Sequence, residues 1–189
     1  MIAYKGFKED LTCTMGKGTF QYEPGVTYKE DSAKCTSTGF HCTEDPLGCL
    51  YWYNGEGDRY FMVRAEGDIN EDDCHSKISC TELTLVKELT RIQLAAHACR
   101  YMQKYPKRKI ESKYVLSEQG KTEEDFIIVR GKHPEAAGRK GTVFFLIQEE
   151  EKSQKVKVIE AYEVDGKDIK PDKYYTIGGV EVRPCRKKN

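Results

Sequence analysis

The chain has 189 residues, of which 31 are basic and 31 acidic, so its formal net charge is zero. Binding of nucleic acid over the whole surface needs an excess of lysine and arginine, and mimicry of DNA needs an excess of acid, so the composition excludes both classes. Aromatic residues are plentiful enough to build a core, and the length allows one large domain or two small ones.

The amino terminus carries no long apolar run, which predicts that the chain has neither a signal peptide nor a membrane helix and works in the cytoplasm. Eight cysteines are many for a reducing compartment. Some of them, such as Cys99, stand where a small apolar residue would fit a helical pattern. We therefore expect mainly buried free thiols.

The first half of the chain mixes strand and helix signals. A short strand is predicted over residues 2–7 and another over 59–66, which alternates roughly between apolar and polar residues. Between them, Thr43 is a suitable N-cap and Pro46 fits the first turn of a short helix. That helix is expected to carry aromatic residues and to end at the glycine-rich run 54–57.

A second pair of elements follows. Residues 77–87 alternate as a strand, with a break near Thr81 and Glu82 that suggests a bulge. Thr90 and Gln93 then form a capping-box pattern, and the helical spacing behind them predicts a helix that runs to about Lys104.

The last third of the chain changes character. Residues 113–124 are polar and resemble a linker, and strand patterns then recur over 126–129, 142–148, 156–164 and 174–182. We therefore expect an α+β protein with three parts. These are a mixed domain over residues 1–112, a linker over 113–124, and a small antiparallel β module over 125–189.

One constellation points to a dinucleotide pocket. The order of Lys5 on a first strand, an aromatic helix with Tyr51, and a later strand with Glu82 is similar to the arrangement in ADP-ribosyltransferases. An oxocarbenium-like centre needs a carboxylate, nicotinamide needs an aromatic face, and pyrophosphate needs a cation. The pattern departs from the family because lysine replaces arginine or histidine at the first position. NAD is thus a cofactor only in this alternative, where Lys5, Tyr51 and Glu82 would be catalytic.

Metal binding and cysteine catalysis find less support. Cys35, Cys42 and Cys49 are each separated by six residues, whereas zinc sites favour pairs of ligands two to four residues apart. His41 and Cys42 are neighbours on an extended segment, so their side chains point to opposite sides. We expect neither a metal site nor a cysteine nucleophile.

Basic residues gather behind the long helix, in a segment with Tyr105, Lys107, Arg108 and Lys109, and again in the tail 183–188. Such residues could contact phosphates locally, with tyrosine adding stacking. The alternative is a solvated helix terminus, where cations suit the helix dipole.

A resemblance rests on three motifs, Tyr4-Lys5-Gly6-Phe7, Phe20-Gln21-Tyr22-Glu23 and Gly39-Phe40-His41-Cys42. With Gly25, Tyr28 and Pro46-Leu47, they make roughly the first hundred residues similar to a family of uncharacterised phage, prophage and mobile-element proteins of gut Clostridia. Proteins that look like this one include inhibitors of type II CRISPR effector nucleases. The resemblance implies the cytoplasm of a bacterial host cell and supplies no catalytic residue.

The leading hypothesis is therefore a binding protein rather than an enzyme, which blocks a host protein or nucleoprotein complex such as a CRISPR effector nuclease. Tyr51, Trp52 and Tyr53 are its expected anchors, because aromatic side chains dominate binding energy at interfaces. The basic segment behind the long helix is expected to add a local contact with nucleic acid. An NAD-dependent transferase, active or inactive, and a phage structural accessory protein are the alternatives. The sequence leaves the oligomeric state open.

Overall fold

A computed structural model describes residues 1–14, 18–35, 37–71 and 76–182. Contacts between residues divide the chain into two units, Met1–Leu94 and Ala95–Asn189, and each is described by itself. No helix in the described ranges has the length and apolar character needed to cross a membrane. The predicted basic tail, residues 183–188, lies outside the described residues.

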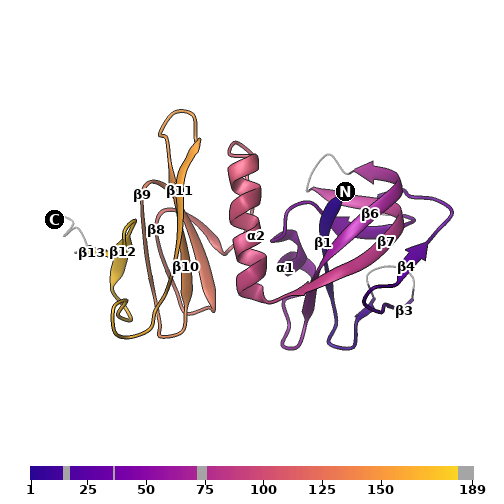
Figure 1. Cartoon of the computed structure of the whole chain (residues 1–189), viewed down its shortest axis with the longest axis horizontal. Helices are drawn as coiled ribbons and strands as arrows, with labels where there is room; N and C mark the ends of the chain where they lie inside the picture. Colours follow the sequence, from indigo (N-terminus) through magenta and orange to yellow (C-terminus); the bar gives the residue numbers. More distant parts are fainter. Residues whose placement is uncertain (15–17, 36, 72–75, 183–189) are drawn as a thin grey trace. The chain divides into compact units, whose positions relative to one another are not determined.

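The first unit is a sheet of mostly antiparallel strands with one short helix (Figure 1). Its sheet consists of β1 (Ile2–Phe7), β4 (Thr27–Lys29), β5 (Phe40–Thr43), β6 (Arg59–Glu71) and β7 (Lys77–Leu89). Two further strands, β2 (Thr12–Cys13) and β3 (Phe20–Gln21), pair with each other, and the helix is α1 (Gly48–Trp52).

Four strands of this unit close into a ring. The strand order β7-β5-β1-β6 is completed by pairing between β6 and β7, so a continuous path of hydrogen-bonded strands returns to its start. The link between β1 and β5 is the narrowest, with Tyr4 opposite Thr43 as its register pair. A closed sheet places alternate side chains inside, which gives this unit one enclosed core.

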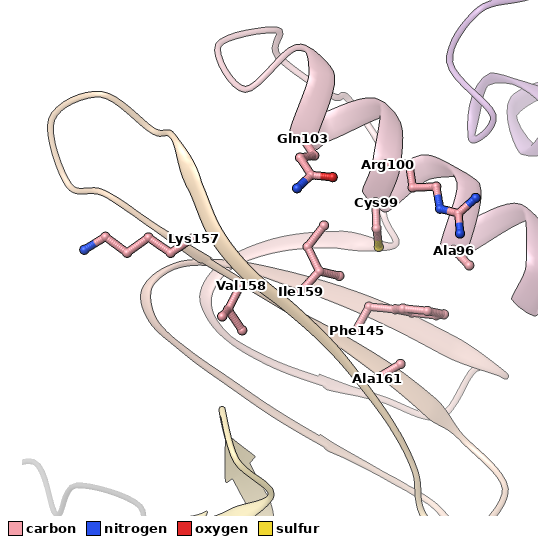
Figure 2. A pocket seen from close by; sticks show the side chains of 9 residues that line it. All are labelled: Ala96, Cys99, Arg100, Gln103, Phe145, Lys157, Val158, Ile159 and Ala161. Atoms are coloured by element: carbon pink, nitrogen blue, oxygen red, sulfur yellow. The ribbon is translucent and has the colours of Figure 1, made fainter.

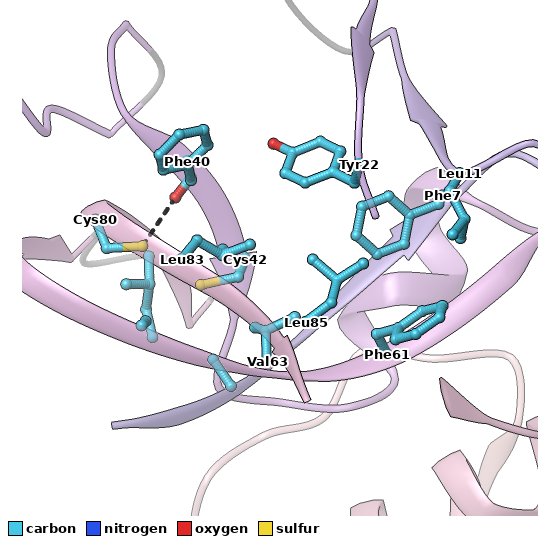
Figure 3. Packing of buried hydrophobic residues seen from close by; sticks show 13 residues of the cluster. Phe7, Leu11, Tyr22, Phe40, Cys42, Phe61, Val63, Cys80, Leu83 and Leu85 are labelled. Carbon is cyan, nitrogen blue, oxygen red and sulfur yellow. Dashed lines mark hydrogen bonds between the residues drawn. The ribbon is translucent and has the colours of Figure 1, made fainter. Parts of the chain in front are cut away.

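The core of the ring is aromatic and sulfur-rich (Figure 3). Phe7 makes edge contacts with Tyr22 and Phe61, at ring-centroid distances of 5.1 and 5.6 Å. The thiol of Cys80 donates a hydrogen bond to the backbone oxygen of Phe40, at 3.5 Å. The core is therefore mainly apolar, but its aromatic rings and thiols are polarisable, and the thiols are weakly polar.

Several elements of this unit match the expectations. The strand over residues 2–7 is present with those bounds, and the strands predicted over 59–66 and 77–87 are longer than expected. The pairing of β6 with β7 is irregular between Glu66 and Ile69, opposite the predicted break near Thr81, although the extra residue lies in β6.

The N-cap of the short helix differs from the prediction. Thr43 is the last residue of β5, and its hydroxyl donates to the backbone oxygen of Asp45 instead. The side chain of Asp45 accepts from the backbone N–H of Leu47, at 3.0 Å. The N-cap position of α1 is Leu47, which has no side-chain cap, so the bond from Leu47 to Asp45 only orders the turn before the helix.

The long helix is confirmed as α2 (Arg91–Lys104). Its predicted capping box forms in both directions. The N–H of Gln93 donates to the Thr90 hydroxyl at 3.1 Å, and the N–H of Thr90 donates to the Gln93 side chain at 2.9 Å. From Ala95 onward, α2 belongs to the second unit.

The second unit is a six-stranded sheet (Figure 1). Its strands are β8 (Val115–Thr122), β9 (Phe126–Gly138), β10 (Val143–Glu149), β11 (Val156–Glu163), β12 (Tyr174–Thr176) and β13 (Val180–Val182). β8 occupies the segment 113–124 that was expected to be a linker. Most side chains of β8 are exposed, so the segment lacks the apolar periodicity that would predict a strand.

The expectation of a purely antiparallel module is wrong for two strand pairs. β8 and β10 each pair in parallel with β9, although only residues 123–125 and 139–142 separate the strands. Parallel neighbours normally need a long crossover. Here the start of β9 lies between β10 and the start of β8, and its end lies between the end of β8 and β12. The chain winds as successive coils, as in a solenoid.

Both faces of the coiled sheet are apolar. One face contributes Ile127, Val129, Phe144 and Leu146 to an enclosed cluster. Because strand side chains alternate, Ile128 and Phe145 point to the opposite face and are also buried. The helix α2 lies over this second face, as its shared hollow with Phe145 shows (Figure 2).

Candidate functional site

The short helix α1 presents two large aromatic side chains to solvent. Cys49 and Leu50 are buried and fix the helix to the sheet, whereas Tyr51 is 79% exposed and Trp52 is 49% exposed. A helix of this length is marginal by itself, so its position depends on these buried residues. The chain thus holds two exposed aromatic rings on a supported element.

The two rings are ordered with respect to each other. Their centroids are 4.8 Å apart and their planes meet at 75°, an edge-to-face contact. The ammonium of Lys77, at the start of β7, lies 5.1 Å from the centre of the Trp52 ring, within cation–π range. We call Tyr51, Trp52 and Lys77 the aromatic platform.

The third expected anchor, Tyr53, does not belong to the platform. It is 4% exposed, and its hydroxyl lies 3.0 Å from the thiol of Cys13. Its ring also packs against Gly6, where an added Cβ would come within 2.6 Å. Tyr53 follows the last residue of α1 and turns inward, so it supports the platform from below and cannot contact a partner there.

The three residues of the transferase alternative are not brought together. Lys5 is 6% exposed and points to the same side of β1 as the core residues Ala3 and Phe7. Glu82 adjoins the core residue Leu83 on β7, so it points to the outer face, where it pairs with Lys29 at 2.8 Å. With Tyr51 exposed on α1, these positions do not form one pocket.

Lys5 instead sits among uncharged groups inside the ring. Its ammonium donates to the backbone oxygen of His41 at 2.7 Å, lies 3.7 Å from the thiol of Cys13, and is 5.5 Å from the ring centres of Phe7 and Tyr22. Burial, with help from the charge of Lys5, lowers the pKa of His41. Within the described ranges, no carboxylate is in ion-pair distance of Lys5.

The predicted basic segment makes contacts within itself. The guanidinium of Arg108 lies 4.0 Å from the ring centre of Tyr105, and it donates to the hydroxyl of Tyr101 at 2.6 Å. Lys109 pairs with Glu111 at 2.8 Å, with both side chains largely exposed. Lys107 is exposed. The segment therefore combines a stacked Arg108–Tyr105 pair with two solvated lysines, and a partner would meet that pair already formed.

Of the cysteines in the described ranges, Cys42, Cys49, Cys80 and Cys99 are buried, whereas Cys13 and Cys35 are half-buried. Burial raises the pKa of Cys99 to about 12 and that of Cys49 further, which keeps both protonated. The hydrogen bond between Cys42 and Cys80 raises the pKa of Cys42, and burial acts in the same direction. Among the residues with described positions, no group of three histidine, cysteine, aspartate or glutamate side chains could hold a metal ion.

The second unit contains a groove that the sequence patterns did not predict. A hollow of about 360 Å³ separates α2 from β11 (Figure 2). The helix lines it with Ala96, Cys99, Arg100 and Gln103. Their i, i+3, i+4, i+7 spacing marks one helix face, on which Cys99 is buried as expected and Arg100 is exposed.

Comparison with known proteins adds a family but no activity. A family model described as a domain of unknown function, DUF7666, matches residues 1–97. No curated protein matches the chain. The matched range takes in all of the first unit and therefore the aromatic platform.

Proposed function

Since the chain belongs to the family of the domain of unknown function DUF7666, whose description assigns no activity, we propose a function from the surface of the matched unit. The protein acts by binding, and the aromatic platform is its anchor for a protein or nucleoprotein partner. The observation that carries this proposal is the exposure of Tyr51 and Trp52 side by side on α1.

Binding at the aromatic platform is favoured by the burial of apolar surface and by the restricted motion of the two rings before binding. Large rings in water are costly in free energy, and a partner that covers them recovers about 25 cal/mol for each Å² of apolar surface. The mutual contact of the rings and the ammonium of Lys77 restrict their motion before binding, which lowers the entropy lost on association. Tryptophan and tyrosine at the centre of an interface commonly dominate its affinity.

The first partner class to test is a defence complex of a bacterial host, with a type II CRISPR effector nuclease as its first member. The protein would act there in the host cytoplasm, as an accessory protein of a phage or mobile element. Neutral net charge suits an inhibitor that works by shape and local contacts instead of a general electrostatic field. The stacked Arg108–Tyr105 pair is a candidate for an additional contact with guide RNA or target DNA.

The test uses the full chain and a guide-loaded effector nuclease, with affinity measured by biolayer interferometry. The double variant Tyr51→Ala, Trp52→Ala should lose about 2 kcal/mol or more, roughly thirtyfold in Kd. Val86→Ala is the matched control, since Val86 is 48% exposed in the same unit but lies on β7. Its affinity should equal that of the wild type.

The same pair of variants decides between partners if the nuclease does not bind. Pull-down from host lysate followed by mass spectrometry should recover a partner with the wild type and Val86→Ala, and lose it with the double variant. A partner recovered equally by all three would refute the platform as the anchor. Presence of the protein in purified phage particles would favour the structural alternative, and nicotinamide release abolished by Glu82→Gln would favour the transferase.

A further inference from the structure

The groove in the second unit lies beside an open sheet edge. β11 ends the strand order β11-β10-β9-β12-β13, and β10 is its only strand partner in the described part of the chain. One edge of β11 therefore carries backbone N–H and C=O groups that the sheet does not use. An edge of this kind can accept a further strand from another chain.

The helix α2 lies over the face of β10 and β11 beside this edge. Phe145 on β10 and Ala161 on β11 are directly paired, and both line the hollow under α2 together with Ile159. Ala96 and Cys99 form the helix side of the hollow, and their small side chains leave space (Figure 2). The groove thus lies on the helix-side face of β10 and β11, next to the open edge of β11.

The charges around the groove have one sign. Arg100 on α2 and Lys157 on β11 both line it and are both exposed, and Gln103 is the other polar side chain on its helix wall. The described lining contains no acidic residue. A strand added to β11 would therefore gain from acidic side chains at the alternate positions that face Arg100 and Lys157.

From these observations we infer that β11 and α2 form a docking site for an extended acidic segment of a partner protein, which adds as a strand to the edge of β11. Main-chain hydrogen bonds to β11 supply affinity, and acidic side chains at every second position, on the face toward Arg100 and Lys157, supply specificity. This site is separate from the aromatic platform and does not depend on it.

The experiment uses the full chain and three synthetic peptides labelled with a fluorophore. The first alternates glutamate with valine, the second replaces glutamate by lysine, and the third carries proline at alternate valine positions so that it cannot complete a strand. Fluorescence anisotropy should show saturable binding of the first peptide alone. Saturable binding of the lysine peptide or of the proline peptide with equal affinity, or no binding of the first peptide, would overturn the inference.

Variants locate the site. Arg100→Glu with Lys157→Glu should weaken binding of the glutamate peptide by roughly tenfold or more and permit the lysine peptide to bind. Lys152→Glu is the control, because Lys152 is exposed in the turn before β11 and outside the groove. Circular dichroism of both variants checks that the fold is retained. Equal loss in the control variant would assign the effect to general charge and reject the groove.

Two further measurements separate this inference from the rest. The double variant Tyr51→Ala, Trp52→Ala should bind the glutamate peptide as the wild type does, so loss of the platform function leaves this result intact. Sedimentation at increasing concentration tests whether the edge of β11 pairs with a second copy of the chain. A dimer that the glutamate peptide cannot dissociate would replace the proposed partner by the chain itself.

Discussion

The two units bury charged groups in different ways. In the second unit, Arg130 on β9 contacts Glu149 on β10 through two nitrogens, and it also donates to the backbone oxygen of Pro106 at 2.8 Å. In the first unit, Lys5 has a backbone oxygen, a thiol and two aromatic rings around it, and Asp45 is held by the N–H of Leu47. The second unit buries a matched pair, whereas Lys5 and Asp45 of the first unit have neutral hydrogen-bond partners.

This difference separates stabilising from costly burial. A buried pair loses solvation on both sides but recovers it through direct hydrogen bonds. A single buried charge recovers less, because neutral partners replace water only in part. The second unit should therefore depend on its pair, and the first unit should tolerate or benefit from the loss of its charges. Substitutions that remove a charge but keep a similar shape should therefore change the free energy of unfolding in opposite directions in the two units.

The largest effect is expected from Arg130→Met. It leaves Glu149, whose side chain is 8% exposed, without its cation, so the free energy of unfolding should fall by about 3–5 kcal/mol. Urea unfolding of the full chain gives the size of the change, and amide hydrogen exchange in β9 and β10 gives its location. A change below about 1 kcal/mol would mean that the pair does not stabilise this unit.

Lys5→Met should act in the opposite direction. Methionine fills a similar volume among Phe7 and Tyr22 without a charge, so we expect the free energy of unfolding to rise by about 1–2 kcal/mol. The same urea titration measures it, with hydrogen exchange read in β1 and β6. Destabilisation comparable to that of Arg130→Met would remove the contrast between the units and indicate a stabilising role for the ammonium.

The titration of Asp45 should make the stability of the folded chain depend on pH. Burial raises the pKa of Asp45 to about 6, so the folded chain binds a proton that the unfolded chain releases near pH 4. Stability should therefore fall as pH rises from about 4 to about 6. Asp45→Asn keeps an oxygen acceptor for Leu47 and should flatten this slope, with a gain of about 1 kcal/mol at pH 7. An unchanged slope would assign the pH dependence to other groups.

The smallest effect is expected from an exposed pair in the second unit. Lys132 and Glu151 are 3.0 Å apart, with side chains 51% and 70% exposed. Glu151→Gln should change the free energy of unfolding by less than about 0.5 kcal/mol. This variant is a control that removes a carboxylate near β10 from an exposed position. A larger effect would show that exposure does not explain the difference between this pair and the Arg130–Glu149 pair.

Local chemistry made part of the fold predictable from sequence. The capping box of Thr90 and Gln93 located the start of α2, and its helical spacing located the end near Lys104. Strand alternation found β1, β6 and β7. These signals lie within a few residues of one another, so they need no knowledge of the rest of the chain.

Features that depend on distant partners were missed. β8 is exposed on most of its side chains, and its strand character comes from pairing with β9. The winding of β8, β9 and β10 follows from how long strands bend, which no periodicity records. At the candidate site, the sequence placed Tyr51 and Trp52 correctly in an exposed helix but could not show that Tyr53 turns inward. Lys77 was missed because it is distant in sequence from α1.

The winding of the second unit bears on how the chain folds as it leaves the ribosome. Each of β9 and β10 pairs with the strand that was made immediately before it, so its template is already present when it emerges. The ring of the first unit cannot assemble in this stepwise manner, because β1 pairs with the later strands β5 and β6, and the ring closes only when β7 pairs with both of them. Loop closure over that separation is the slower event. The earliest-made segment is therefore left longest with an unpaired strand, and chaperones would be expected to act there.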